Sequence, residues 1–211
     1  VIDNPRNLGL GNSLRIGLTE AINLNADIIV NIDADGQYNP EDIPHLIAPI
    51  LQNKADLVLA NRFNRLNYKM PLIKRMGNKF TSWCVRRLSG TSVRDCQTGF
   101  RAISRPLAEA LKSLLKGSYT YTQEMIIHAK FNGFEILEID ADFNARIHGD
   151  SRLISNVFSY FSKVVRIMIG TYKDYKPLQF FGLLSLVFII IGLIALGLDA
   201  FGLLQGTHPI S

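Results

Sequence analysis

The sequence predicts an α/β fold, built around a mostly parallel sheet and followed by a membrane helix. Residues 27–32 and 56–60 are short apolar runs, and the first shows no polar alternation, as in strands covered on both faces. Stretches with apolar residues at helical spacing lie between such runs, and this alternation is typical of layered α/β domains. Residues 178–198 differ, because these 21 residues carry no formal charge. We therefore expect a globular domain and a separate apolar helix.

The elements follow in order along the chain. Residues 1–3 have the pattern of the end of a strand, and a glycine-rich turn then leads into a helix over residues 11–24. After the strand at 27–32, Asn39 and Pro40 mark the next helix, because asparagine caps helix N-termini and proline fits their first turn. The further predicted elements are a strand at 56–60, a helix with a basic face at 70–88, a strand at 101–103, helices at 105–115 and 120–131, and a strand at 135–139.

The end of the chain predicts a transmembrane helix over residues 177–204. At about 1.5 Å per residue, its uncharged stretch spans roughly 31 Å, the thickness of a hydrocarbon core. Residues 154–176 combine apolar positions at helical spacing with lysine and arginine, which favours an amphipathic helix on the membrane surface. An ordinary helix packed on the domain is the alternative. Since lysine and arginine precede the apolar stretch and none follows, the domain at residues 1–153 is expected on the cytoplasmic side.

Composition narrows the class of partner. The net charge of +5 suits a ligand that carries phosphate, such as a nucleotide, a nucleic acid or an anionic lipid. A basic–aromatic motif is missing, so we expect no nucleic acid. The two cysteines, Cys84 and Cys96, have no ligand-like spacing and favour a reducing compartment.

Two carboxylates, Asp33 and Asp35, stand directly after the buried strand at 27–32. Ligands of open α/β sheets bind beyond the carboxyl ends of strands, and Mg²⁺ takes carboxylate oxygens together with substrate phosphates. The first interpretation is therefore a divalent-metal site for a nucleotide diphosphate, with Gln37 as a helper. A plain turn is a second. A calcium loop over residues 31–42 is a third, opposed by the aspartate at its last position and by Pro40.

Six segments in order resemble a known family: NLGLGNSLRIGL, NIDADGQYNPEDIPHLI, DLVLANRF, DCQTGFRAISR, YTQEM and RIHGDSRL. Together they resemble family 2 glycosyltransferases, specifically the polyprenyl-phosphate mannosyl- and glucosyltransferases similar to dolichyl-phosphate mannosyltransferase. The resemblance implies a GT-A-like nucleotide-sugar fold, Mg²⁺ or Mn²⁺, and inverting transfer of a hexose from GDP-mannose or UDP-glucose to polyprenyl or dolichyl phosphate. The family's first strand and its nucleoside-binding acidic segment have no counterpart here. We therefore expect an N-terminally truncated chain that is inactive by itself.

The resemblance also implies roles for individual residues. Asp33, Asp35 and Gln37 match the metal and diphosphate motif, and Asp95 matches the position usually assigned as catalytic base, so Asp35 and Asp95 are the predicted catalytic residues. Because a phosphate acceptor arrives already anionic, Asp95 has a second interpretation, in which it orients the acceptor or a nearby arginine. The other implied site residues are Asn7 and Gly9 near the nucleotide, Arg62 and Arg75 at the acceptor phosphate, Arg146, Ser151 and Arg152 at the donor diphosphate or acceptor phosphate, and Glu124 as a further acid.

Two other functions stay open at this point. One is a transferase of the same superfamily that acts on a glycan or another lipid, although such enzymes usually carry a Gln-x-x-Arg-Trp motif, which is absent here. The other is a membrane-anchored calcium-binding protein that uses residues 31–42. The partners expected from the leading interpretation are a nucleotide-sugar donor, a polyprenyl or dolichyl phosphate and membrane lipid, with a homo-oligomer left open.

Overall fold

The computed structural model describes residues 1–4, 6–7, 9–67, 70–115, 121–145 and 157–204. The chain forms two compact units, Val1–Met168 and Ile169–Ser211.

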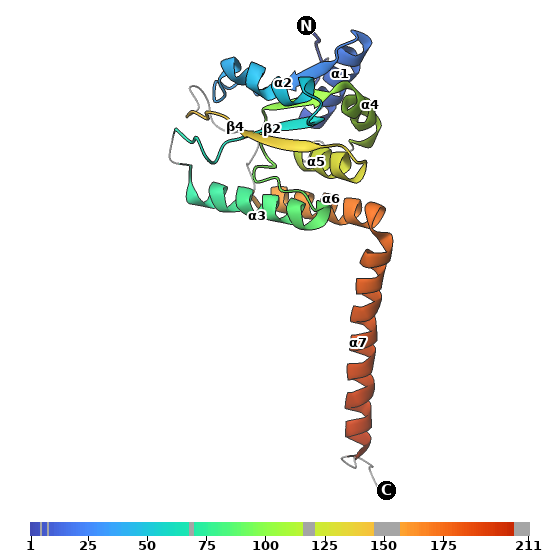
Figure 1. Ribbon diagram of the computed structural model, residues 1–211. Coiled ribbons are helices and arrows are strands. Elements are labelled where there is room, and N and C mark those ends of the chain that lie inside the picture. The colour runs from blue at the N-terminus through green and yellow to red at the C-terminus, as the bar shows by residue number, and fades with distance from the viewer. Residues whose placement is uncertain (5, 8, 68–69, 116–120, 146–156, 205–211) are drawn as a thin grey trace. The chain divides into compact units, whose positions relative to one another are not determined.

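A four-stranded mixed sheet with the order β1-β3-β2-β4 forms the centre of the first unit (Figure 1). Its strands are β1 (Ile28–Asn31), β2 (Leu57–Asn61), β3 (Arg101–Ser104) and β4 (Ile136–Asp140). β2 and β4 pair in parallel, whereas β3 lies between β1 and β2 and runs antiparallel to both. Three strands thus share one direction, as a mostly parallel sheet requires, but only β2 and β4 are parallel neighbours.

Helices cover both faces of this sheet, and each face has its own apolar core. α2 (Ile43–Leu51) packs over the face that carries Val58 and Ala102, and α1 (Leu10–Asn23), α4 (Arg105–Leu114) and α5 (Tyr121–Phe131) pack over the face that carries Leu57 and Ile103. Alternate residues of β2 therefore enter opposite cores, and all five of its residues are buried. Full coverage was expected for residues 27–32, but the residues of β1 are only half-buried, and β2 is the fully covered strand.

Local signals set two helix ends, of which the one at Asn39 was expected. The Asn39 side chain accepts a hydrogen bond from the Glu41 amide, and the helix then begins as a 3₁₀ turn, η1 (Pro40–Asp42), before α2. α3 (Leu72–Ser89) ends at Gly90, whose φ of 72° is the left-handed conformation that glycine adopts easily. Residues 1–3, expected as the end of a strand, belong to none of the described strands. A strand needs a hydrogen-bonded neighbour, and the described part of the sheet offers residues 1–3 none.

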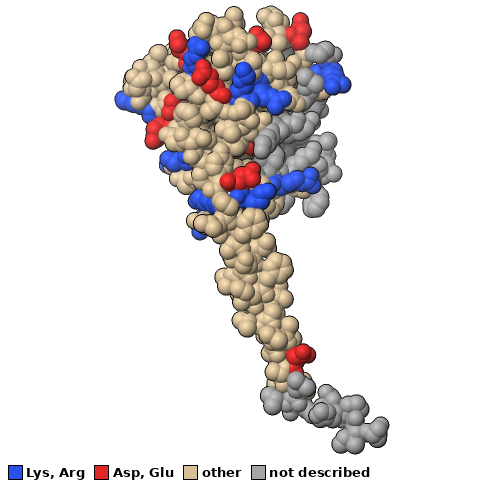
Figure 2. All heavy atoms as spheres, turned by 90° about the vertical axis from the view of Figure 1, so that its right-hand side faces the viewer, with Lys and Arg blue, Asp and Glu red and all other residues tan. Residues whose placement is uncertain are grey.

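The second unit is dominated by α7 (Pro177–Leu204). Among the described residues, Pro177–Gly202 is the one helical stretch long and apolar enough to cross a membrane, with a mean hydropathy of 2.8. The sequence of α7 contains one charged residue, Asp199. Figure 2 shows the visible face of this helix as mostly tan, which marks residues other than Lys, Arg, Asp and Glu. At the start of α7, the Tyr172 hydroxyl donates a hydrogen bond of 3.1 Å to the Gln179 side chain. The length and composition of α7 are those of a membrane span.

α6 (Val157–Tyr175) confirms that the expected amphipathic segment is helical. Its residue Met168 is buried in one of the two cores of the first unit. The placement of this helix on a membrane surface stays a prediction.

Candidate active site at the carboxyl edge of the sheet

Three polar segments meet at one edge of the sheet. Asp33 and Asp35 follow β1, Arg62 follows β2, and residues 95–99 precede β3. Because β3 is antiparallel to β1 and β2, its start lies beside their ends. This is the edge at which ligands of open α/β sheets bind.

The side chain of Asp33 packs directly against the backbone of Gly99. A Cβ atom built on Gly99 would overlap the carboxylate of Asp33. Asn31 holds the same glycine, since its Nδ2 donates a hydrogen bond of 2.6 Å to the Gly99 carbonyl oxygen. Glycine is therefore needed at position 99 for space, because any side chain there would displace Asp33.

Asp35 and Gln37 form a tight turn beyond β1. The Gln37 amide donates a hydrogen bond of 3.2 Å to Asp35 Oδ1, and Gly36 between them has a φ of 72°. Gln37 is buried, and its Nε2 donates a hydrogen bond of 3.0 Å to the carbonyl oxygen of Asn144. The Asn144 amide in turn donates to the Gln37 carbonyl at 2.8 Å. Gln37 thus anchors the turn to the segment after β4, and its role as a metal ligand stays a prediction.

Tyr38 connects this turn to the loop before β3. Its hydroxyl lies 3.0 Å from the Thr98 hydroxyl and accepts a hydrogen bond of 3.0 Å from the Gly99 amide. Its ring packs against Phe100 and Phe143, with centroid distances of 5.3 and 4.9 Å. Burial raises the pKa of Tyr38 to about 12, so the phenol stays neutral near neutral pH and supports the loop as a hydrogen-bonding group.

A buried ion pair joins the end of β2 to the same loop. Arg62 Nε lies 2.6 Å from Asp95 Oδ2, and Arg62 Nη2 lies 2.8 Å from Asp95 Oδ1. The amides of Arg62 and Gln97 also donate to this carboxylate, at 3.2 and 3.3 Å. Asp95 is fully buried. Both oxygens of Asp95 are thus occupied by donors, an arrangement that suits the orientation of Arg62 better than proton abstraction from an acceptor.

Glu138 on β4 holds the loop from its other side. Its carboxylate accepts hydrogen bonds of 2.8 and 2.9 Å from the Arg94 amide and of 2.8 Å from the Asp95 amide. Burial raises the pKa of Glu138, and the bonds from these amides oppose that rise. A pocket of about 360 Å³ beside this carboxylate is also lined by Asn61 and Asp140. Glu138 therefore fixes the backbone that presents Asp95.

Arg101 is fully buried behind the loop. Its Nε and Nη2 donate to the Thr98 carbonyl at 2.8 and 2.6 Å, and Nη2 also donates to the Cys96 carbonyl at 3.2 Å. Its Nη1 donates to the Thr122 carbonyl at 3.2 Å and to Met125 Sδ at 3.5 Å. Within the described residues, no carboxylate hydrogen-bonds to this guanidinium, and burial lowers the pKa of Arg101. Arg101 thus holds the Cys96 and Thr98 carbonyls inward.

Comparison with known proteins shows the family to which the chain belongs. The family model described as glycosyl transferase family 2 matches residues 1–112, more than half of the chain. The chain belongs to glycosyl transferase family 2.

Relatives of this glycosyltransferase have been named for transfer to lipid phosphates. It is 38% identical over 141 residues to the UDP-N-acetylglucosamine–dolichyl-phosphate N-acetylglucosaminyltransferase of Methanococcus voltae, over 65% of this chain and 56% of that relative. It is 27% identical over 174 residues to the dolichol-phosphate mannosyltransferase of Pyrococcus furiosus, over 80% of this chain and 47% of that relative. The chain spans about half the length of these curated relatives.

Solved structures confirm the GT-A-like fold of the glycosyltransferase. The glucosyl-3-phosphoglycerate synthase of Mycobacterium tuberculosis with bound UDP has a TM-score of 0.53 at 20% identity, over 83% of this chain and 56% of that one. The same enzyme with Mn²⁺, UDP and phosphoglyceric acid also has a TM-score of 0.53, at 19% identity, over 83% of this chain and 55% of that one.

The other expected site residues of the glycosyltransferase lie in several places. The Asn7 side chain accepts a hydrogen bond of 2.9 Å from the Gly9 amide, in a turn before α1. Arg75 is exposed on α3, whereas Glu124 is buried on α5. The roles of these four residues stay predictions. Three further expected residues lie outside the described part of the chain: Arg146, Ser151 and Arg152.

The candidate metal ligands are two carboxylates, Asp33 and Asp35, rather than a complete set of protein ligands. The described part of the chain contains no group of three or more histidine, cysteine, aspartate or glutamate side chains that could hold a metal. Mg²⁺ commonly binds one or two carboxylates and completes its shell with substrate phosphates and water, so Asp33 and Asp35 fit such a cation. A calcium loop fits less well, because strand β1 leads into residues 31–42 and η1 occupies their end.

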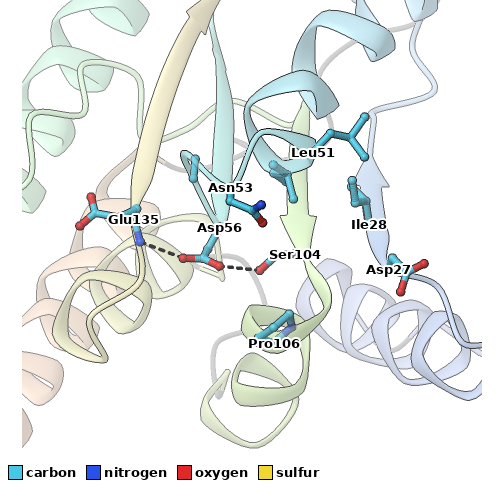
Figure 3. A pocket seen from close by; sticks show the side chains of 10 residues that line it. Asp27, Ile28, Leu51, Asn53, Asp56, Ser104, Pro106 and Glu135 are labelled. Atoms are coloured by element: carbon cyan, nitrogen blue, oxygen red, sulfur yellow. Dashed lines mark hydrogen bonds between the residues drawn. The ribbon is translucent and has the colours of Figure 1, made fainter.

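The opposite edge of the sheet holds a pocket that contains none of the expected site residues. This pocket of about 410 Å³ lies where β1 and β2 begin and is lined by Asp27, Asp56, Ser104 and Glu135 among others (Figure 3). Asp56 is fully engaged there, since the Ser104 hydroxyl donates to its Oδ1 at 2.9 Å and the Glu135 amide to its Oδ2 at 3.1 Å. This network joins three strand ends and has a structural role.

Sequence reasoning missed Tyr38, Arg101 and Glu138 as parts of the site. A charged residue inside a predicted strand was the available signal for Arg101 and Glu138, because such a residue needs polar partners if the strand is buried. Tyr38 offered no comparable signal.

Proposed function

We propose that the protein transfers a hexose from GDP-mannose or UDP-glucose to a polyprenyl or dolichyl phosphate at the cytoplasmic face of a membrane. The observation that carries this proposal is the convergence of Asp33 and Asp35 with the Arg62–Asp95 pair at one edge of the sheet. Carboxylates suit a cation that holds a diphosphate, and a guanidinium suits a phosphate acceptor. The names of the two archaeal relatives and the apolar helix α7 support this acceptor class and a membrane location.

In this reaction an acceptor phosphate oxygen attacks C1 of the sugar, the bond from C1 to the donor diphosphate breaks, and the configuration at C1 inverts. A Mg²⁺ or Mn²⁺ held by Asp33 and Asp35, with Gln37 as the further candidate, would neutralise charge on the departing diphosphate. Gly99 contributes by leaving room for Asp33.

The acceptor side of the reaction needs a positioned cation more than a base. The second pKa of a phosphomonoester is about 6, so the attacking oxygen is already anionic near neutral pH. Arg62 supplies the cation, and Asp95 holds its guanidinium by two hydrogen bonds. In this proposal Asp95 is a positioning residue for Arg62, and Glu138 supports both through the loop backbone.

The test uses the full-length protein in membranes, with labelled GDP-mannose, UDP-glucose or UDP-N-acetylglucosamine and either polyprenyl or dolichyl phosphate. We expect one donor to pass label into the lipid phase, and we expect EDTA or Asp35→Asn to stop the transfer. The matched control is Asp27→Asn, which alters a carboxylate at the opposite end of β1 and should leave transfer intact. Label that enters a water-soluble glycan would overturn the acceptor class, and transfer insensitive to EDTA would overturn the metal.

A further inference from the structure

The outward face of α3 carries a continuous apolar surface. Leu72, Ile73, Met76 and Trp83 are 71%, 77%, 62% and 54% exposed, and Phe80 is 48% exposed. With about 100° of rotation per residue, these five positions fall within an arc of about 100° on one side of the helix. Large apolar side chains gathered in this way mark an interaction surface.

The opposite face of α3 carries mostly small and polar side chains, and their contacts with the domain explain the orientation of the helix. Its buried residues are Asn78, Thr81, Ser82, Val85 and Ser89. Ser82 Oγ accepts a hydrogen bond of 3.2 Å from the Cys96 amide, which ties α3 to the loop that carries Asp95. Hydrophobic burial alone would have turned the apolar face inward, yet these polar contacts hold it outward.

Cations lie along the same surface. Arg75 and Lys79 are exposed at one border of the apolar arc, and Arg87 is exposed toward its C-terminal end. Trp83 stacks on Phe80 with a centroid distance of 6.0 Å and an interplanar angle of 28°. A helix with aromatic and aliphatic residues on one side and lysine and arginine beside them has the composition of helices that lie in a membrane interface.

We propose that the apolar face of α3, formed by Leu72, Ile73, Met76, Phe80 and Trp83, docks onto an anionic lipid surface. Charge complementarity between the bordering cations and lipid phosphates selects this occupant. The chain also carries its own candidate membrane span, which begins nine residues after Met168 and keeps the first unit near a bilayer when α7 is inserted. This inference does not rest on the transfer reaction.

The chain has a built-in probe for this docking, because Trp83 is its single tryptophan. The full chain is reconstituted into vesicles of phosphatidylcholine, with or without phosphatidylglycerol, and quenching of Trp83 by brominated acyl chains is measured. We expect quenching and a blue-shifted emission in the anionic vesicles, and weaker quenching in neutral vesicles or at high salt. Ile73→Glu and Met76→Glu should abolish the quenching.

Two controls separate docking from insertion and folding. Leu24→Glu changes a leucine that is 81% exposed and lies outside α3, and it should leave the quenching of Trp83 unchanged. Resistance to carbonate extraction, expected for every variant, reports on α7. Absence of lipid quenching in both vesicle types would overturn the proposal. Quenching of Trp83 by aqueous iodide is measured as well. If protection from iodide increased with the protein-to-lipid ratio, a second copy of the chain would be covering this face, and the proposal would be overturned.

Discussion

The carboxylate of Asp33 occupies the space that a side chain at position 99 would need. Gly99 is itself fixed from two sides, by the Asn31 amide group on its carbonyl oxygen and by the Tyr38 hydroxyl on its amide. The position of Asp33, an expected metal ligand, therefore depends on the absence of a Cβ atom at position 99, just before β3.

Gly99→Ala is expected to displace Asp33 and to destabilise the fold by about 1–3 kcal/mol, because overpacking forces neighbours away from their preferred positions. Sugar transfer and its dependence on metal concentration measure the loss of function, and chemical denaturation in detergent micelles measures stability. The same substitution in an Asp33→Ala background should cost much less, since the clashing carboxylate is gone. Equal costs in both backgrounds would contradict the contact.

Gly77→Ala on α3 is the matched control for that experiment. A Cβ atom there meets nothing within 4 Å, and the residue is helical. We expect a gain of about 0.5–1 kcal/mol in stability, since alanine favours helix over glycine, and no change in metal dependence.

Asp95→Asn is expected to destabilise the protein by about 3–5 kcal/mol, because it leaves the buried Arg62 guanidinium without its counter-ion. Glu109→Gln is the matched control, since it breaks the exposed Arg105–Glu109 pair, whose atoms are 3.1 Å apart. That change should cost less than about 0.5 kcal/mol. Denaturation curves of the purified variants measure both costs.

Kinetics of the same pair distinguish a positioning role from a base. If Asp95 orients Arg62, then Arg62→Lys, Asp95→Asn and the double variant should lower kcat by similar factors, because either change removes one shared unit. A far larger loss for Asp95→Asn than for Arg62→Lys, together with loss of the acidic limb of the pH profile, would instead support the base.

Arg101→Lys is expected to destabilise the protein by more than about 2 kcal/mol, although the charge is kept. Lysine carries its donors on one nitrogen and cannot reach the Cys96, Thr98 and Thr122 carbonyls together, and each unpaired buried carbonyl costs about 1–3 kcal/mol. Hydrogen exchange at the Gly99 amide should accelerate. Arg105→Lys, at an exposed arginine, is the control, and equal effects at the two positions would contradict this role.

The pH dependence of stability should carry a contribution from Glu138. Burial raises its pKa above the ordinary value of 4.5, so the folded protein disfavours the ionised carboxylate relative to the unfolded chain. Its stabilising contribution is therefore full below that value and is lost as pH rises through the raised pKa. Glu138→Gln should gain stability relative to the parent as pH increases, measured as the difference in Tm across a pH series. A difference that is constant with pH would contradict the assignment.

Activity should respond to Glu138 in the opposite sense. The ionised carboxylate is the form that accepts all the bonds from the Arg94 and Asp95 amides, so transfer should increase as Glu138 ionises. Glu138→Gln should lower kcat and remove this acidic limb, and an unchanged limb would assign it to another group.

The sequence predicted most elements because their signals are local. The apolar run before Asp33, the cap at Asn39 and the apolar stretch of α7 each depend on neighbouring residues, and the structure contains the corresponding elements. The insertion of β3 between β1 and β2 was not predictable in this way, because strand order is decided by contacts between distant residues. Arg101 was predicted only as the start of a strand. Its partners are backbone carbonyls, and every residue has one, so the residue types in the sequence do not indicate which carbonyls it binds.

Asp95 shows a second limit of sequence reasoning. Its motif identified an important carboxylate, but the motif could not show whether that carboxylate faces a substrate or a buried arginine. The second interpretation, orientation of a nearby arginine, is the one that the contact with Arg62 favours.

The central place of β3 in the sheet also has a consequence for biosynthesis. β1 and β2 are made before β3, yet neither pairs with a neighbouring strand of the described sheet until residues 101–104 have been translated. Until then the ends of β1 and β2 stay separate, and Arg62 lacks the loop that carries its counter-ion. Because pairings across such long sequence separations close slowly, the whole edge should form late and in one cooperative step. A ribosome-bound chain that stops short of β3 should therefore lack the site entirely, even though it already contains Asp33, Asp35 and Arg62.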